Sequence, residues 1–301
     1  MQHFAADRAV TEFGPGFDAV GQVDQGETFT VETADCYDGQ LADPSTLRPQ
    51  IDMARFNRAS GPVAVRGIEP GEAVAVSIED VDLAPAGVMA LAPGLGLLGE
   101  DVETATTRVL EVRDGHAWLT PEVAVPLRPM VGILGAATAE ERIPTSTPGV
   151  HGGNLDTRTI RPGATVMLRA RQPGLGLAVG DLHAAMGDGE LGGTGIEIGG
   201  TVRLRVDRVA DYDGAWPAVV DDDGLHILAS GAPFERAARA AFREAVALMA
   251  RWQDLSWPDA YRLTSVVGDL QVSQLVNPQV TARMSIPGRW VSDDVLAVRS
   301  R

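Results

Sequence analysis

Two glycine-rich segments in the middle of the chain contain the densest group of side chains with catalytic or metal-binding chemistry. They are residues 148–158 (PGVHGGNLDTR) and 180–190 (GDLHAAMGDGE), and together they hold His151, Asp156, Asp181, His183, Asp188 and Glu190. Glycine lets a ligand approach the backbone closely, while imidazoles and carboxylates act as metal ligands or proton acceptors. Imidazoles combined with oxygen ligands suit Zn or Mn, whereas carboxylates alone would suit Ca or Mg. The alternative interpretation is a set of turns whose carboxylates are solvated.

Short β-type runs separated by Gly and Pro turns extend from the N-terminus to about residue 210. The clearest runs are Thr28–Thr33, Ala73–Ile78, Trp118–Pro126, Ala164–Ala170 and Thr201–Val206. Alternating β-branched residues between closely spaced turns are typical of sheets packed on one another, as in sandwiches and barrels. We therefore predict a mainly β fold in which the two glycine-rich segments meet around one pocket.

The chain changes character after residue 230. Residues 234–252 are rich in Ala, lack Gly and Pro, and repeat apolar residues at helical spacing. The predicted apolar stripe of this helix consists of Phe234, Ala238, Phe242, Val246 and Met249. A second, shorter helix is expected after Ser256, because Pro258 suits a first helical turn. No long linker intervenes, so we predict a single domain over 1–301, β-rich over 1–230 and with a small helical layer within 231–301.

The composition argues against several functional classes. The formal net charge of -16 disfavours nucleic acid and anionic membranes as partners, because both would be repelled. No lysine is present, and arginine stays protonated, so amidase mechanisms built on a Ser-Lys pair or a Glu-Lys-Cys set are excluded. The single cysteine, Cys36, permits no intrachain disulfide and fits a reducing compartment, for which the cytoplasm is the default. No apolar run approaches the ~20 residues needed to span a bilayer.

Several segments resemble the acetamidase/formamidase family, in order along most of the chain. The signature region is represented by GVHGGNLD (149–156) and GDLHAAMGDGE (180–190). Further similar segments are GETFTVETADCYDGQL (26–41), SGPVAVRGIEPGEAVAV (60–76), RPMVGILG (128–135) and SVVGDLQVSQLVNP (265–278). Matches in this order are far more specific than any one motif. The resemblance implies the family's own β-rich fold and hydrolysis of short aliphatic amides, such as formamide or acetamide, to ammonia and a carboxylate.

The resemblance also implies roles for individual residues. A divalent metal ion, with Zn favoured and Ca or Mn as alternatives, is expected to be bound by a shell drawn from Asp35, His151, Asp156 and His183. Glu190, which closes the GDGE motif, is the candidate base that activates water, and Asp188 is the second candidate catalytic residue. Asn154 and Gly153 are the candidate substrate-binding residues. A small-molecule amide is the expected partner, and the chain is expected to form a homo-dimer or a higher homo-oligomer.

Alternatives remain for both mechanism and function. In the favoured scheme a metal or Glu190 activates water, and backbone donors at Gly152–Gly153 or Gly187–Gly189 hold the oxyanion. In the rival scheme Cys36 is a covalent nucleophile, although a buried cysteine is more often a small core residue. The chain could instead hydrolyse cyclic amides, as a γ-lactamase does, or be an inactive member that binds small molecules or metal. His3, His116 and His226 are interpreted as surface or structural residues.

Overall fold

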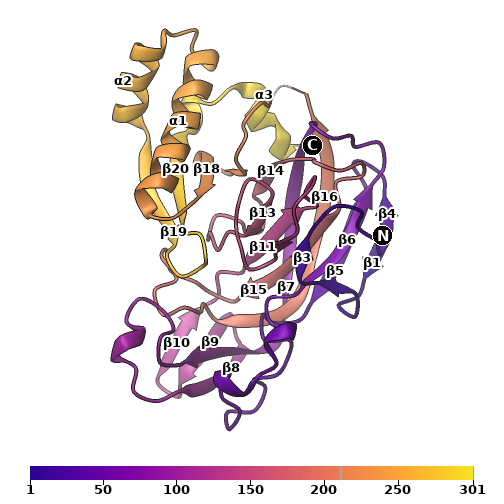
Figure 1. The fold of residues 1–301 in the computed structure, drawn as a ribbon, viewed down its shortest axis with the longest axis vertical. Helices are drawn as coiled ribbons and strands as arrows, with labels where there is room; N and C mark the ends of the chain where they lie inside the picture. Colours follow the sequence, from indigo (N-terminus) through magenta and orange to yellow (C-terminus); the bar gives the residue numbers. More distant parts are fainter. Residues whose placement is uncertain (211, 301) are drawn as a thin grey trace.

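Strands dominate the computed structural model, which describes residues 1–210 and 212–300 (Figure 1). The strands are β1 Gln2–Phe4, β2 Ala9–Val10, β3 Glu12–Phe13, β4 Gly21–Val23, β5 Thr28–Thr33, β6 Ala59–Val65, β7 Ala73–Leu91, β8 Thr106–Arg113, β9 His116–Thr120, β10 Val123–Pro126, β11 Met130–Ala136, β12 Ile143–Pro144, β13 Gly152–Asn154, β14 Thr165–Arg169, β15 Leu177–His183, β16 Glu197–Val209, β17 Ala218–Val220, β18 Gly224–Ser230, β19 Asp269–Gln274 and β20 Thr281–Pro287. The helices are α1 Phe234–Trp252, α2 Trp257–Val267 and α3 Asp293–Leu296. The predicted mainly β class with helices near the C-terminus is confirmed.

Long antiparallel strands connect the parts of the fold. In the described residues, 18 strands form one hydrogen-bonded network, and β3 pairs with β12 separately. β7 and β16 pair with each other, and they run from the body of the molecule into the part that contains β8, β9 and β10 (Figure 1). β17 pairs with both β14 and β18, so the sheet continues into the part covered by the helices. This continuity fixes the C-terminal strands relative to the two glycine-rich segments.

Two large apolar cores and two smaller apolar clusters of the described residues stabilise this arrangement. The larger core is filled by β-branched and aliphatic side chains from the β-rich part, including Val76, Leu134 and Leu204, all fully buried. β-branched residues favour strands because they pack well on a pleated surface. The smaller core lies between α1 and the strands β18 and β20, where Ile227 and Met284 contact the helix-side cluster. Helix and sheet therefore share one apolar interface at the C-terminal end.

The first helix begins and ends where the sequence predicts, but its buried face differs from the predicted stripe. Val246 and Met249 are buried as expected, whereas Phe234, Ala238 and Phe242 are only half-buried. The buried positions of the first turns are alanines, at 237, 241 and 245. Small side chains let the helix lie close to the sheet, which leaves the larger Phe242 facing α2, where its ring contacts Tyr261 at 5.2 Å. The side chain of Ser256 caps α2 by accepting a hydrogen bond from the backbone N–H of Asp259.

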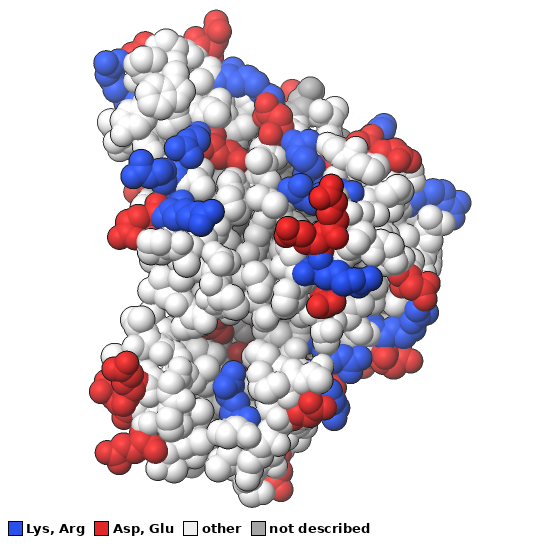
Figure 2. Space-filling model, in the orientation of Figure 1, with Lys and Arg blue, Asp and Glu red and all other residues white. Residues whose placement is uncertain are grey.

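Charged groups are distributed over the surface without a continuous basic area on the face that Figure 2 shows, where arginines alternate with acidic side chains. This face gives no extended path for a phosphate backbone. In the part of the chain that the structure describes, no helix combines the length and the apolar character that crossing a membrane requires.

Candidate active site

The candidate site is built on β15, which lies between β11 and β16. Asp181 and His183 are two residues apart on this strand, so their side chains lie on the same face. The register of β15 and β16 places His183 directly opposite Glu197. Nε2 of His183 is 3.0 Å from Oε2 of Glu197 and 3.6 Å from Oδ1 of Asp181. Glu190 approaches from the following loop, with Oε1 at 3.9 Å from the same nitrogen.

These side chains form two adjoining triplets of possible ligand atoms. One triplet is Asp156, His183 and Glu190, and the other is Cys36, Asp181 and Glu197. Within each triplet the ligand atoms all lie within 4.8 Å of one another, and every member is buried. His183 contacts Asp181 and Glu197 as well as its own triplet, so we refer to the six residues together as the acidic cluster.

The backbone at three members of the acidic cluster has an uncommon conformation. Asp156, Asp181 and Glu190 have positive φ values of 37°, 54° and 47°. Non-glycine residues avoid this left-handed region, and such strain collects at functional sites where the surrounding structure imposes it. Gly132 on β11 makes room for two of these side chains, because a Cβ there would lie 2.5 Å from Oδ1 of Asp156 and 2.7 Å from Oδ2 of Asp181. The sequence thus provides both the turns and the space that the carboxylates need.

Burial of so many carboxyl groups together changes their proton affinities. Burial raises the pKa of Glu190 to about 7 and that of Glu197 to about 8. Burial also raises the pKa of Asp156 well above its usual value. For His183, burial alone would lower the pKa, but the neighbouring carboxylates of Glu197 and Asp181 raise it well above the ordinary value. The cluster therefore contains groups that exchange protons near neutral pH, as acid–base catalysis requires.

The acidic cluster opens into a pocket of about 290 Å³. Its polar wall includes Asp181, Glu190 and Glu197, together with Asn154 and Asn277. Arg48, Asn57 and Ser146 also line it, and the apolar part of the wall is formed by Met53, Phe56, Leu95, Val276 and Pro278. Its volume suits a small ligand, and its combination of apolar walls with a few converging polar groups is typical of small-molecule sites.

The donor atoms of the acidic cluster fit a divalent cation. Nδ1 of His183 and Oδ1 of Asp156 are buried and make no hydrogen bond, and Nε2 of His183 and Oε2 of Glu197 lie 3.0 Å apart without hydrogen-bond geometry. Buried polar atoms are normally satisfied, so a group of unsatisfied imidazole and carboxylate atoms has the composition of a ligand set. These buried acidic and histidine side chains could hold a metal ion. Asp156 and His183 would be its ligands, and an oxygen of Glu190 lies within 4.8 Å of both ligand atoms.

A loop from the C-terminal part of the chain completes the site. Nδ2 of Asn277 donates hydrogen bonds to Oδ2 of Asp156 at 2.6 Å and to the backbone O of Asn154 at 3.0 Å. The loop is fixed by the buried side chain of Gln274, whose Oε1 accepts from the backbone N–H groups of Val276 and Asn277. Gln274 therefore acts by holding Asn277.

Not all the residues proposed from the sequence lie in the acidic cluster. The structure brings Asp156, His183 and Glu190 together and places Asn154 in the pocket wall. Asp35 instead stabilises the turn that carries Cys36, since its Oδ1 accepts from the backbone N–H groups of Tyr37 and Gly39. Burial raises the pKa of Asp35.

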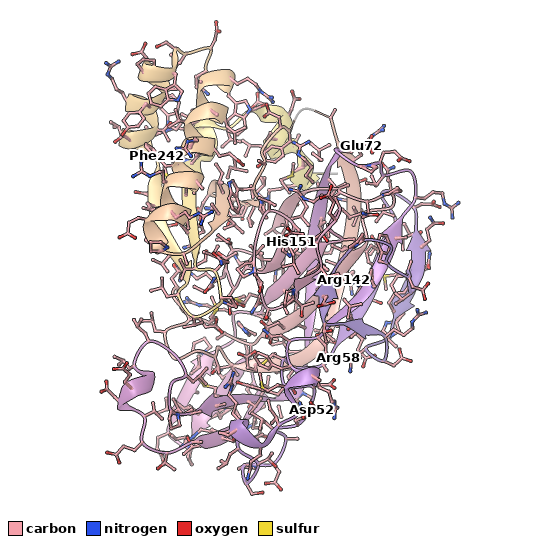
Figure 3. All side chains as sticks on the ribbon, in the orientation of Figure 1. Asp52, Arg58, Glu72, Arg142, His151 and Phe242 are labelled. Atoms are coloured by element: carbon pink, nitrogen blue, oxygen red, sulfur yellow. The ribbon has the colours of Figure 1, made fainter. Side chains whose placement is uncertain are left out.

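His151 lies beside β11 and β13 (Figure 3), and it is not a member of either triplet. Its ring packs against Phe13, with the ring centroids 5.2 Å apart, and burial lowers its pKa to about 4. Gly153, the neighbour of Asn154 on β13, has φ of 88°, and a Cβ there would lie 2.4 Å from the backbone O of Thr147. Close backbone packing thus accounts for the glycine at this position.

Asp188 faces away from the acidic cluster and forms ion pairs with two arginines. Both of its oxygens accept from the guanidinium of Arg283, at 2.9 and 2.8 Å, and Arg158 lies 3.1 Å from Oδ2. A bidentate pair of this kind fixes a carboxylate in place. Asp188 therefore has the geometry of a residue that holds the loop carrying Glu190.

The sequence named Asp181 among the candidate side chains without a specific role, and it did not single out Glu197 or Asn277. The spacing of Asp181 and His183 on a strand was a readable signal, because alternate residues share a face. Glu197 had no local signal, since its place depends on the register between β15 and β16. Asn277 lies in a segment that resembles the family, but its approach to Asp156 spans 121 residues of the chain.

Comparison with known proteins identifies a family and close structural relatives. A model of the acetamidase/formamidase family matches residues 4–147 and 137–214. The crystal structure of an acetamidase from Bacillus halodurans is similar with a TM-score of 0.94 and 37% identity, covering 96% of this chain and 98% of that one. A formamidase from Methylophilus methylotrophus is 25% identical over 256 residues, 65% of this chain and 63% of the relative. An acetamidase from Mycolicibacterium smegmatis is 25% identical over 263 residues, 65% of this chain and 64% of the relative. The chain thus spans about three fifths of the length of the curated relatives it matches.

Proposed function

Because this chain belongs to the acetamidase/formamidase family, we propose that it hydrolyses the C–N bond of short aliphatic amides to ammonia and a carboxylate. The observation that carries this proposal is the buried triplet of Asp156, His183 and Glu190 at a pocket of about 290 Å³. Relatives of this chain are named formamidase and acetamidase, which favours formamide and acetamide as substrates. The small pocket is consistent with a short acyl group.

In the proposed mechanism, water attacks the carbonyl carbon of the amide, and Glu190 accepts the proton that the water loses. A carboxylate with a pKa of about 7 is partly ionised at neutral pH, so it accepts the proton of the attacking water. The protonated Glu190 then donates to the leaving nitrogen. The backbone N–H of Gly195 donates to Oε1 of Glu190 at 3.1 Å and orients the carboxylate.

Asn154 is positioned to bind the substrate amide. Its Oδ1 is buried without a hydrogen-bond partner, and the residue lines the pocket. An unsatisfied acceptor of this kind matches the N–H donors of a primary amide. Binding the amide there would orient the carbonyl carbon toward the acidic cluster.

A divalent cation is part of the proposal, with zinc favoured by the mixed imidazole and carboxylate donors. Asp156 and His183 would hold it, and Glu190, whose oxygen lies within 4.8 Å of both ligand atoms, would stay free to exchange a proton. When bound, such a cation acts as a Lewis acid and lowers the pKa of coordinated water from 15.7 to about 7. Metal analysis of the purified protein by mass spectrometry tests its identity.

The covalent alternative through Cys36 has less support. The thiol is buried, and burial together with the neighbouring Glu197 and Asp181 raises its pKa well above the ordinary value. Nucleophilic cysteines need a lowered pKa and positive surroundings, so this environment favours the neutral thiol. We therefore propose that Cys36 packs beside Asp181 and does not attack the substrate.

Two further properties complete the proposal. We propose a homo-oligomeric assembly and a cytoplasmic location, the latter supported by the free, buried Cys36. Light scattering after gel filtration measures the assembly, and fractionation of cells that express the chain measures the location.

An ammonia-release assay tests the proposed activity directly. The panel contains formamide, acetamide, propionamide and a γ-lactam, each with and without a chelator. Hydrolysis of the linear amides that is lost with chelator and restored by zinc supports the proposal. Hydrolysis of the lactam alone would instead favour a cyclic-amide hydrolase. No release from any compound in the zinc-loaded protein would favour a binding function without catalysis.

A further inference from the structure

A second cavity, separate from the acidic cluster, is rich in arginine. It has a volume of about 570 Å³ and lies where β18, β19 and β20 face the segments around residues 128 and 160. We call it the arginine pocket and define it by Arg128, Arg158, Arg161, Arg283 and His226; two carboxylates, Asp221 and Asp223, also line it. The chain as a whole has 41 acidic residues against 25 basic ones, so this local collection runs against the composition.

The base of the arginine pocket is rigid. Arg283 is buried, and its two terminal nitrogens hold Asp188 while its Nε donates to Oε1 of Gln271 at 3.0 Å. On the other side, Nε2 of His226 is 2.9 Å from Oδ1 of Asp221, and its Nδ1 is 2.7 Å from Oγ of Ser285. These fixed contacts hold the wall in one arrangement, so a ligand would meet a preformed site.

The arginines at the mouth of the arginine pocket have N–H donors that could bind a ligand. Arg158 and Arg161 each use one nitrogen in an ion pair, at 3.1 Å to Asp188 and 3.4 Å to Asp221, and their side chains are about half exposed. Arg128 makes no side-chain ion pair within the part of the chain described here. A guanidinium has five N–H donors, so each of these side chains has donors left for a ligand.

We propose that the arginine pocket binds a small oxyanion, of carboxylate or phosphate chemistry, through Arg128, Arg158 and Arg161. Planar guanidinium groups match the oxygens of both ligand classes and bind them in bidentate fashion. The four arginines at the pocket outnumber the three nearby carboxylates, Asp188, Asp221 and Asp223, so the local charge favours an oxyanion although the whole chain is negative. This site does not depend on amide hydrolysis.

The arginine pocket shares a wall with the loop of Glu190. Asp188 contacts both Arg158 and Arg283, and Glu190 is two residues further along. Two backbone hydrogen bonds hold the intervening Gly189: its N–H donates to O of Ser273, and its O accepts from the N–H of Leu275. An oxyanion at Arg158 would therefore share that guanidinium with Asp188.

Isothermal titration calorimetry of the full chain with inorganic phosphate and, separately, acetate tests the site at constant ionic strength. We expect saturable binding of at least one anion. Binding of phosphate or of acetate shows whether the site takes a phosphate or a carboxylate. The variant Arg128→Gln should weaken that binding about tenfold, the loss of one charge-assisted contact. Arg128→Gln with Arg161→Gln should abolish it. The matched control Arg262→Gln, which removes an exposed arginine of α2, should bind as the unaltered chain does.

Three outcomes would overturn the inference. They are no saturable binding of either anion, unchanged affinity in Arg128→Gln, or equal weakening in the Arg262→Gln control. Circular dichroism of each variant verifies that the fold is retained, and Arg128 is exposed, so its replacement is not expected to disturb packing. Acetate binding that Arg128→Gln leaves unchanged is assigned to the acidic cluster, and the inference is then overturned unless phosphate binds and is weakened by Arg128→Gln.

Discussion

Nδ2 of Asn277 donates a hydrogen bond of 2.6 Å to Oδ2 of Asp156. This contact joins the loop after β19 to the turn after β13, and the same amide also holds the backbone of Asn154. Because the other oxygen of Asp156 makes no hydrogen bond, Asn277 leaves one oxygen of that carboxylate available toward His183 and Glu190. The C-terminal part of the chain thus orients a proposed ligand in the middle part.

We expect Asn277→Ala to lower metal affinity and amidase activity about 10–100-fold, as loss of a hydrogen bond to a metal-ligating carboxylate does. The structural reason is that Asp156 would lose its fixed orientation. Zinc affinity by competition with a chromophoric chelator, and kcat/KM for acetamide, measure the effect. The matched control is Gln279→Ala in the same loop, for which both values should be unchanged. Equal losses in both variants would mean that the loop itself had become disordered.

We expect Glu190→Gln to reduce kcat about 10²–10⁴-fold, the range for removal of a general base. Glutamine keeps the shape of the side chain but accepts no proton from water. Ammonia release measures the loss, with Glu103→Gln, at an exposed position, as the control. Full activity of Glu190→Gln would remove Glu190 from the mechanism.

Cys36→Ala should retain most of the activity if water is the nucleophile. The thiol is buried and its pKa is raised, so it is not expected to react. Kinetics with acetamide, alongside Cys36→Ser, measure this directly. Loss of activity in both variants, with normal unfolding temperatures, would restore the covalent mechanism.

Local patterns predicted much of the fold. The helix at 234–252 and the strand at 28–33 have the bounds expected from their spacing, because both depend on neighbouring residues. The sequence also indicated His183 and Glu190 as candidate site residues, because both lie in one short segment, residues 180–190. Trp118–Pro126, expected as one run, is instead the end of β9 and then β10, paired antiparallel around residues 121 and 122.

The remaining part of the site depends on distant contacts. Glu197 reaches His183 through strand register, and Asn277 reaches Asp156 through the packing of the C-terminal strands. Asp35 and His151 lie in segments that resemble the family. The carboxylate of Asp35 accepts a hydrogen bond within its own turn, and the ring of His151 packs against Phe13, so neither side chain is part of the acidic cluster. Periodicity and spacing carry no information on such contacts, because they are decided by tertiary packing.

We expect Gly132→Ala to destabilise the chain by about 1–3 kcal/mol, the usual cost of overpacking. The added Cβ would lie 2.5 Å from Oδ1 of Asp156 and 2.7 Å from the backbone O of Asp181. Urea unfolding measures the stability, and zinc affinity should fall as well because both carboxylates are displaced. Gly187→Ala is the matched control, since a Cβ added at Gly187 would meet no atom of a non-adjacent residue within 4 Å. Unchanged stability and zinc affinity in Gly132→Ala would show that the carboxylates adjust freely.

The raised pKa values predict how the metal-free chain responds to pH. Glu190 and Glu197 have pKa values of about 7 and about 8 when folded, against an ordinary value of 4.5. Between the ordinary pKa of 4.5 and the raised values of about 7 and about 8, the folded state therefore binds more protons than the unfolded state. The free energy of unfolding falls as the pH rises through this range. The raised pKa of His183 and that of Glu244, which burial raises to about 7, act in the same direction, whereas the lowered pKa of the buried His151 opposes them below about pH 6.5. The lowered pKa of Asp181 adds stability only above its unfolded value of 3.8, so it is constant in this range.

We therefore expect the urea midpoint of chelator-treated protein to fall as the pH is raised from about 5 through about 8. Zinc should reverse this trend, because a cation favours the ionised carboxylates and stabilises the folded state by mass action. Glu197→Gln removes one of the titrating groups, so the chelated variant should show a shallower dependence than the unaltered chain. A midpoint that rises with pH in the presence of chelator would mean that the cluster is already ionised without metal, and the argument for a cation between Asp156, His183 and Glu190 would lose its electrostatic basis.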